Sequence, residues 1–291
     1  MGQDLSSATV RLAHRLFLDR EPDSEGAVGH MRHCGTLKRL REVFLNSHEF
    51  ELIMESRPRL VRADAPRLKL VWDADDATVR RLLVTLGAAW DGVAPADGDG
   101  GPQVADLLAI LQRNDLALPK QAHGFELGCG AGRVTRDLAR HLHRLTAADA
   151  SPVQLAAAKS RVPGNVALRL ADDLSFGMAE GFELFYSFRA LQHGPPPLIA
   201  RALAAAFAAL RPGGIAVFQL PTHALGYSYP PDPALAPPSD PANDLHVLPQ
   251  PVVFALAARH GCQPVEVIED LAAGPSALWR SNLFVLRKQD G

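Results

Sequence analysis

The sequence predicts an α/β fold in which helices flank a parallel sheet. The first observation is residues 123–137, where an apolar strand runs into a glycine turn and then into a helix with Val134, Leu138 and Leu142 at i, i+4 and i+8. The second is the alternation of strand and helix patterns that continues from Gly124. Such alternation is typical of βαβ units, whose crossovers are right-handed.

The composition indicates a globular protein without a general affinity for nucleic acid. Hydrophobic residues make up 47% of the 291 residues and charged residues 21%, and the net charge is −2. A near-neutral chain lacks the basic excess that nucleic-acid binders usually carry. Its three widely spaced cysteines, the lack of a signal-peptide pattern and the lack of a long apolar run together predict a cytoplasmic protein without stable membrane insertion.

The N-terminal part, residues 1–57, has a helical pattern of its own. Pro22 interrupts this pattern, and Thr36 is placed to cap a later helix. The segment Leu-Phe-Leu-Asp-Arg-Glu-Pro-Asp-Ser-Glu-Gly, followed by Phe-Leu-Asn-Ser-His-Glu-Phe, resembles the short helical repeat of phycobilisome linker proteins and of a bacterial domain attached to secreted proteins and glycosyltransferases. The resemblance implies a docking unit with a protein partner, and a helical cap on the main domain is the alternative.

Residues 58–118 predict a helical linker or cover. A helix pattern spans residues 76–90, a loop rich in Gly, Asp and Pro spans 91–102, and a second helix pattern spans roughly 103–116. Because these helices directly precede the glycine turn, we expect them to cover a binding cleft.

The main domain, residues 119–291, carries the alternating pattern. The predicted strands are 124–127, 144–148, 166–170, 184–188, 215–220, 265–269 and 282–287, and the predicted helices are 134–143, 152–161 and 197–210. The proline-rich stretch 221–251 is an insertion between a strand and a helix. Its length favours a substrate loop or lid.

The glycine turn departs from the dinucleotide fingerprint. That fingerprint, G-x-G-x-x-G, needs a glycine at position 133, where this chain has Arg133, and the third glycine stands one residue earlier at Gly132. Asp149 ends the next strand, where a carboxylate can hold both hydroxyls of a ribose. Asp172 ends the third strand, where a carboxylate can accept a hydrogen bond from an adenine amino group. A nicotinamide oxidoreductase therefore stays a weaker alternative.

Five motifs in register form a larger pattern. They are Glu-Leu-Gly-Cys-Gly-Ala-Gly-Arg, Ala-Asp-Ala-Ser-Pro, Ala-Asp-Asp, Leu-Gln-His and Leu-Arg-Pro-Gly-Gly. Over residues 120–291 this set resembles the class I S-adenosylmethionine-dependent methyltransferases. The resemblance implies a Rossmann-like sheet of seven strands with an antiparallel last strand, and S-adenosyl-L-methionine as the cofactor.

The resemblance also implies roles for single residues. The glycines let the backbone pass beside the methionine part of the cofactor, and Glu126 orients its ammonium group. Asp149 holds the ribose, while Asp172, with Asp173 as second choice, meets the adenine. The full expected cofactor set is Glu126, Gly128, Cys129, Gly130, Gly132, Asp149, Ala150, Asp172, Asp173, Leu174, Ser187 and Phe188. The structural alternatives are a Glu126–Arg133 ion pair, Asp149 as a helix cap and Asp172 as a solvated loop residue.

Three histidines are candidates for a general base: His193 after the fourth strand, His223 after the fifth, and His246 near the end of the insertion. No metal-ligand cluster stands out in the sequence, so we expect a metal-independent reaction. The motifs Leu-Gln-His-Gly-Pro-Pro-Pro, Phe-Gln-Leu-Pro-Thr-His and His-Val-Leu-Pro-Gln resemble those of bacterial methyltransferases from cell-surface polysaccharide gene clusters. This resemblance implies O-methylation of a sugar or glycan intermediate. A small-metabolite or protein acceptor, and a cofactor-binding docking module without turnover, are the alternatives.

Overall fold

The chain divides into two compact units. The computed structural model describes residues 5–18, 20–48, 74–173, 181–229, 244–273 and 279–290. One unit consists of Met1–Leu68 with Ala109–Leu116, and the other of Lys69–Leu108 with Ala117–Gly291. Residues 69–108 therefore belong to the same unit as the sheet. The predicted domain boundaries at 57 and 118 stay predictions.

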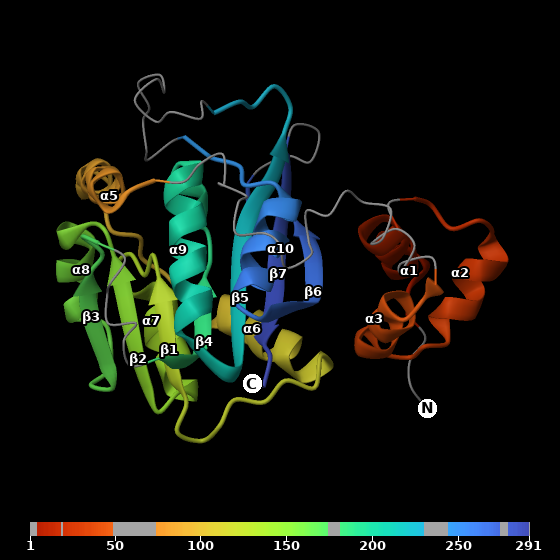
Figure 1. The fold of residues 1–291 in the computed structure, drawn as a ribbon. Helices are drawn as coiled ribbons and strands as arrows, with labels where there is room; N and C mark the ends of the chain where they lie inside the picture. The colour runs from red at the N-terminus through yellow and green to blue at the C-terminus, as the bar shows by residue number, and fades with distance from the viewer. Residues whose placement is uncertain are drawn as a thin grey trace. The chain divides into compact units, whose positions relative to one another are not determined.

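A seven-stranded sheet forms the centre of the larger unit (Figure 1). Its order is β3-β2-β1-β4-β5-β7-β6. Strands β1 to β5 pair in parallel, and β7 pairs antiparallel with both β5 and β6. The strands are β1 His123–Leu127, β2 Arg144–Asp149, β3 Val166–Leu170, β4 Phe182–Ser187, β5 Leu210–Ala224, β6 Cys262–Asp270 and β7 Trp279–Lys288. This topology confirms the predicted Rossmann-like fold with its antiparallel last strand.

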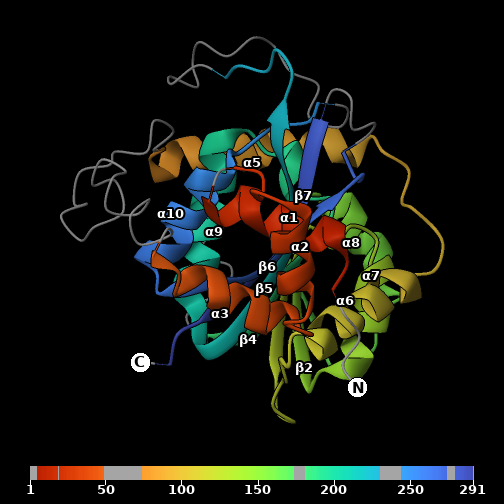
Figure 2. The same cartoon turned by 90° about the vertical axis from the view of Figure 1, so that its right-hand side faces the viewer.

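Helices cover both faces of this sheet. Figures 1 and 2 show α9 and α10 on one face and α7 and α8 on the other. The bounds are α5 Asp76–Asp91, α6 Gly101–Arg113, α7 Arg133–Leu138, α8 Pro152–Lys159, α9 Pro196–Ala209 and α10 Gln250–Arg259. Helix α5 packs against both α8 and α9. Among the helices described, none is long and apolar enough to cross a membrane.

Aromatic packing fills the middle of the sheet. Phe125 and Phe182 stack with ring centroids 5.3 Å apart, and Phe218 and Phe284 stack at 5.1 Å. All four side chains are fully buried. They anchor β1, β4, β5 and β7 to one core, so that the carboxyl ends of these strands are held on a rigid base.

Most predicted elements match the structure to within about three residues at each end, and one helix and one strand differ more. The helix predicted over residues 134–143 ends at Leu138 and continues as a 3-10 turn, η2 (Ala139–His141). Strand β5 runs on to Ala224, into the stretch predicted as the insertion 221–251, and α10 begins at Gln250. The strand is long because its last residues pair with the start of β7, across a bulge between Pro221 and His223. Residues 230–243 of the insertion lie outside the described residues.

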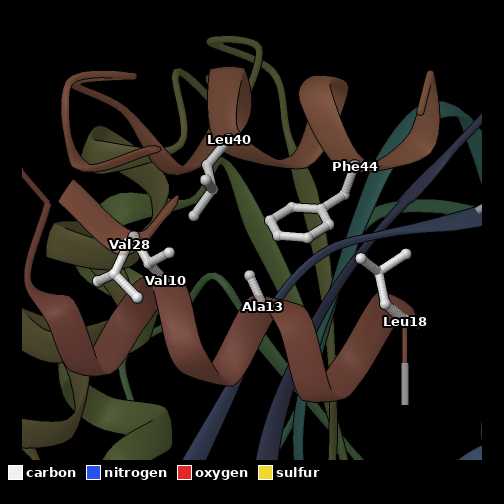
Figure 3. Packing of buried hydrophobic residues seen from close by; sticks show 6 residues of the cluster. All are labelled: Val10, Ala13, Leu18, Val28, Leu40 and Phe44. Carbon is white, nitrogen blue, oxygen red and sulfur yellow. The ribbon is translucent and has the colours of Figure 1, made fainter. Parts of the chain in front are cut away.

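The N-terminal unit has a core of its own. It contains α1 (Ser7–Ala13), a π-helical turn η1 (His14–Leu18), α2 (Glu25–Arg32) and α3 (Leu37–Leu45). The predicted cap is confirmed, because the Thr36 hydroxyl accepts a hydrogen bond from Arg39 N at 3.2 Å. Figure 3 shows how the side chains meet, and the buried set is Val10, Ala13, Leu18, Val28, Leu40 and Phe44. The resemblance of this unit to the phycobilisome-linker repeat stays a prediction.

Candidate active site

The glycine turn follows β1 and adopts a backbone that favours glycine. Gly128, Gly130 and Gly132 have φ angles of 81°, 52° and 81°. A Cβ added to Gly128 would stand 2.0 Å from the Cβ of Ala190, whereas one added to Gly130 would meet nothing within 4 Å. Gly128 is therefore required for close packing against the segment after β4, and Gly130 faces open space.

Replacing Gly128 with Ala is expected to lower the free energy of unfolding by about 2–4 kcal/mol, because it combines overpacking with an unfavourable φ. Denaturant unfolding of the full chain measures this change. Gly164→Ala is the matched control, since a Cβ there meets nothing within 4 Å. Equal stability of Gly128→Ala and Gly164→Ala would contradict the packing described for the turn.

Asp149 braces the turn from the end of β2. Its Oδ2 accepts a hydrogen bond from Gly130 N at 2.8 Å, and its Oδ1 accepts one from Ser151 N at 2.9 Å. Burial raises the pKa of this carboxyl, and the charge of Asp91 adds to the effect. The side-chain cap of α8 is supplied by Ser151, whose hydroxyl accepts from Gln154 N. Asp149 is thus not the side-chain cap of α8, and its carboxylate instead fixes the glycine turn.

Asp149→Ala is expected to weaken cofactor binding by about 1–3 kcal/mol, the usual cost of leaving a polar partner unsatisfied. Calorimetric titration with S-adenosylhomocysteine measures the affinity, and thermal unfolding of the same variant reports any loss of fold. An unchanged affinity would remove Asp149 from the site.

Glu126 is a buried carboxyl beside the same turn. Its side chain is 4% exposed, and its Oε2 has no hydrogen-bond partner among the described residues. Burial raises its pKa to about 7, and the nearby charge of Asp149 contributes. The Thr135 hydroxyl opposes part of this rise. A buried carboxyl oxygen without a hydrogen-bond partner is nevertheless costly. It therefore marks a position where a cationic or hydrogen-bond-donating ligand would be stabilised.

Arg133 lies close enough for its charge to oppose part of the rise in the pKa of Glu126, but its guanidinium bonds elsewhere. Its Nη1 donates to the carbonyl of Asp99 at 2.6 Å and to Oε1 of Gln103 at 2.9 Å. The two described residues Glu126 and Arg133 form no ion pair, so the predicted alternative of a Glu126–Arg133 ion pair is wrong. The reason is that the guanidinium is committed to the segment that precedes the glycine turn in sequence.

A cavity of about 360 Å³ lies at the carboxyl ends of the strands. Its lining includes Glu126, Asp149 and, from α5, the apolar side chains of Leu86 and Trp90. Of the three glycines of the turn, Gly128 and Gly130 line the cavity and Gly132 does not. Ligands of open α/β sheets bind at this edge. The volume falls in the usual range for small-molecule sites, roughly 300–1,000 Å³.

The segment between α5 and α6 is fastened over the cavity by residues that the sequence analysis missed. Gln154 Nε2 donates to the carbonyl of Val93 at 2.8 Å, and Arg161 Nη1 donates to the carbonyl of Ala96 at 2.9 Å. Arg161 also pairs with Asp97 at 2.5 Å. Each of these acceptors lies about sixty residues before the side chain that binds it, and two of them are backbone carbonyls. A local sequence pattern could therefore not reveal these contacts.

The three candidate histidines lie in different surroundings. His193 lines the cavity, and its ring meets Trp90 edge-on with centroids 4.9 Å apart. His246 is bound near it, since its backbone N donates to the carbonyl of Gln192 at 2.7 Å and its Nδ1 lies 2.9 Å from the Tyr227 hydroxyl. Burial lowers the pKa of His246. His223 is exposed on β5, so the structure brings only His193 to the cavity wall.

The remaining predicted cofactor residues divide into two groups. Cys129, Ala150 and Phe188 line the cavity. Ser187 is fully buried, and its hydroxyl donates to the carbonyl of Leu127 at 2.9 Å. Its neighbours Tyr186 and Phe188 line the cavity, so the alternation of strand side chains accounts for its different position. Ser187 therefore ties β4 to β1 rather than lining the cavity.

The end of β3 contributes Ala171 to the cavity, but neither Asp172 nor Asp173. Asp172 is exposed, and Asp173 pairs with Arg80 at 3.5 Å. Leu174 lies outside the described residues. The predicted adenine contact of this segment stays a prediction. In the part of the chain that the structure describes, no group of three or more His, Cys, Asp or Glu residues could hold a metal ion.

Comparison with known proteins gives the class of domain. Residues 125–214 match a protein family described as methyltransferase domain. An uncharacterized methyltransferase of Synechocystis sp. is 34% identical over 106 residues, which are 36% of this chain and 50% of that protein. The chain thus matches about half the length of this relative. Residues 125–214, which match the family, contain the glycine turn and strands β2, β3 and β4.

Solved structures give the same architecture. N-methyltransferase NodS from Bradyrhizobium japonicum WM9, in complex with S-adenosyl-L-homocysteine, has a TM-score of 0.50 and 22% identity, covering 74% of this chain and 99% of that one. Magnesium protoporphyrin IX methyltransferase from Synechocystis PCC 6803, with the same molecule bound, has a TM-score of 0.51 and 13% identity, covering 74% and 100%. At these identities the likeness shows the fold. The match of residues 125–214 to a methyltransferase domain supports the predicted enzyme class.

Proposed function

We propose that this chain is an S-adenosylmethionine-dependent methyltransferase. The observation that carries the proposal is the unpartnered buried Oε2 of Glu126 in the wall of the cavity formed by the glycine turn. The cofactor carries an ammonium group, which would supply the missing hydrogen-bond donor and positive charge. Asp149, at the end of the adjacent strand β2, would hold the ribose. The match of residues 125–214 to a methyltransferase domain supports this proposal.

When bound, the cofactor would supply a methyl group that is activated by its attachment to a sulfonium. The protein's own contribution is to align the acceptor and to remove its proton. His193 is the proposed general base, because it lines the cavity. Its edge contact with Trp90 holds the ring in one orientation. His246, attached to the neighbouring Gln192 carbonyl, is the second candidate.

The acceptor we propose is a hydroxyl of a sugar or glycan intermediate. The motifs around His193 and His246 support it, as does the near-neutral charge of the chain, which disfavours nucleic acid. Transfer of labelled methyl groups to a panel of nucleotide sugars and lipid-linked glycans tests the proposal. Turnover on small phenols or acids alone would replace the glycan acceptor by a small metabolite. Cofactor binding without turnover on any acceptor would indicate a docking module instead of an enzyme.

The N-terminal helices are proposed to dock a protein partner. Their support is a separate core, centred on Phe44 and Leu40, in a unit that contacts define as distinct. Cross-linking of the full chain in its native host, followed by mass spectrometry, tests this. Cross-links from residues 5–48 to one other protein would support docking, and cross-links only within the chain would favour a cap.

A further inference from the structure

Arg189 lies two residues after the end of β4 and lines the cavity. Its φ angle is 57°, in the left-handed region that residues with a side chain seldom adopt. Such backbone conformations persist only where the surrounding structure enforces them, and they are found preferentially at functional sites. The backbone conformation of Arg189 therefore indicates a functional position.

Buried polar groups hold the backbone of Arg189 from one side. Its N–H donates to Oε1 of Gln219 at 3.0 Å, and Gln219 is fully buried. The Nε2 of Gln219 donates to Oε1 of Gln192 at 3.1 Å and to the Ser281 hydroxyl at 2.6 Å. This network joins β5 and β7 to the segment after β4, so the orientation of Gln219 is fixed.

The glycine turn holds the same segment from the other side. Ala190 occupies the space that a side chain on Gly128 would need, since an added Cβ there would stand 2.0 Å from the Ala190 Cβ. The backbone of residues 189–190 is thus fixed between Gln219 and Gly128. Its strained conformation is a consequence of this packing.

The side chain of Arg189 is exposed and has no hydrogen bond or ion pair among the described residues. Arg133 and Arg161 differ, because their guanidinium groups are bound to backbone carbonyls of the segment before α6. A rigid backbone therefore places the planar guanidinium group of Arg189, with its N–H donors available, at the cavity. Such a fork matches the geometry of carboxylate and phosphate groups.

We propose that Arg189 binds a carboxylate or phosphate group of the methyl acceptor and so selects anionic acceptors. The inference rests on the methyltransferase function proposed above and deepens it. The position of Arg189 indicates that it contacts the methyl acceptor and not the cofactor. Glu126 and Asp149 lie on β1 and β2, whereas Arg189 lies after β4, four residues before His193 and on the side of the sheet toward β5.

The test uses the full chain saturated with S-adenosylhomocysteine and titrates three probes by calorimetry: UDP-glucose, methyl glucuronide and neutral methyl glucoside. Arg189→Asn removes the charge but keeps a residue that tolerates the left-handed region. It is expected to weaken binding of UDP-glucose, methyl glucuronide or both by roughly 10- to 100-fold, the usual effect of losing a hydrogen bond between charged groups. Arg189→Lys is expected to restore only part of this affinity, because an ammonium lacks the fork.

Two controls separate the explanations. Arg169→Gln, an exposed arginine on β3 that does not line the cavity, is expected to leave all affinities unchanged. The affinity for S-adenosylhomocysteine is expected to be the same in Arg189→Asn and wild type. Anion binding that is absent from wild type, anion binding that does not depend on Arg189, or a loss of cofactor affinity in Arg189→Asn would each overturn the inference. Arg189-dependent anion binding without methyl transfer would instead count against the proposed function alone.

Discussion

Glu126→Gln is expected to weaken binding of S-adenosylhomocysteine at pH 8 by about 10- to 100-fold, because a carboxylate opposite an ammonium group is replaced by a neutral amide. The loss should shrink below pH 7. Burial raises the pKa of the wild-type carboxyl to about 7, so the carboxyl is protonated in the free protein at lower pH and must lose that proton to bind a cation. Calorimetry from pH 6 to pH 8 measures both effects.

The control for this variant is Glu183→Gln. Glu183 lies on β4, pairs with Arg211 at 2.6 Å and does not line the cavity. Its replacement is expected to leave the affinity unchanged at every pH. Equal affinities for wild type and Glu126→Gln at pH 8 would show that Glu126 does not meet the cofactor.

Glu126→Gln is also expected to stabilise the protein in the absence of cofactor. The folded-state pKa of Glu126 is raised from 4.5 to about 7, so its favourable contribution to folding is present below pH 4.5 and is lost as the pH rises through 7. At pH 8 Glu126→Gln is therefore expected to raise the free energy of unfolding by about 1–3 kcal/mol, an advantage that falls away toward pH 5. Denaturant unfolding at the two pH values measures it. A loss of stability at pH 8 would indicate that Glu126 has a structural role.

His193→Ala has the second large expected effect. Removing a general base typically lowers turnover by about 10²- to 10⁴-fold. Cofactor affinity should change far less, because Glu126 and Asp149 lie on other strands. Steady-state turnover on the best acceptor, together with calorimetry on S-adenosylhomocysteine, measures the two quantities separately.

His141→Ala is the matched control, since His141 is exposed on η2 and does not line the cavity. It is expected to leave turnover and affinity unchanged. A loss of both quantities by the same factor in His193→Ala would make His193 a structural partner of Trp90 and would leave His246 as the base.

The fold could be predicted from the sequence because its signals are local. The apolar strand, the glycine turn and the periodic helix at 123–137 each depend on neighbours a few residues apart, and the carboxyl ends of parallel strands share one edge. Glu126 and Asp149 could therefore be placed together before their contacts were known. The glycine at 132 instead of 133 separated this turn from the dinucleotide type.

The parts that could not be predicted depend on distant partners. Strand β5 extends to Ala224 because β7 pairs with it, and no property of residues 221–224 alone indicates this. Arg133 is directed to Asp99 rather than Glu126 by a segment more than thirty residues away. The backbone of Arg189 is bound by Gln219 on β5, and the next residue, Ala190, packs against Gly128, so both of these partners are distant in sequence.

The central claim is that the cavity beside the glycine turn is an S-adenosylmethionine site. Calorimetric titration of the full chain with S-adenosylhomocysteine and, separately, with NAD tests it most directly. We expect one S-adenosylhomocysteine to bind per chain, with an affinity that is lower in Glu126→Gln and in Asp149→Ala, and we expect no binding of NAD. Binding of NAD without binding of S-adenosylhomocysteine would contradict it.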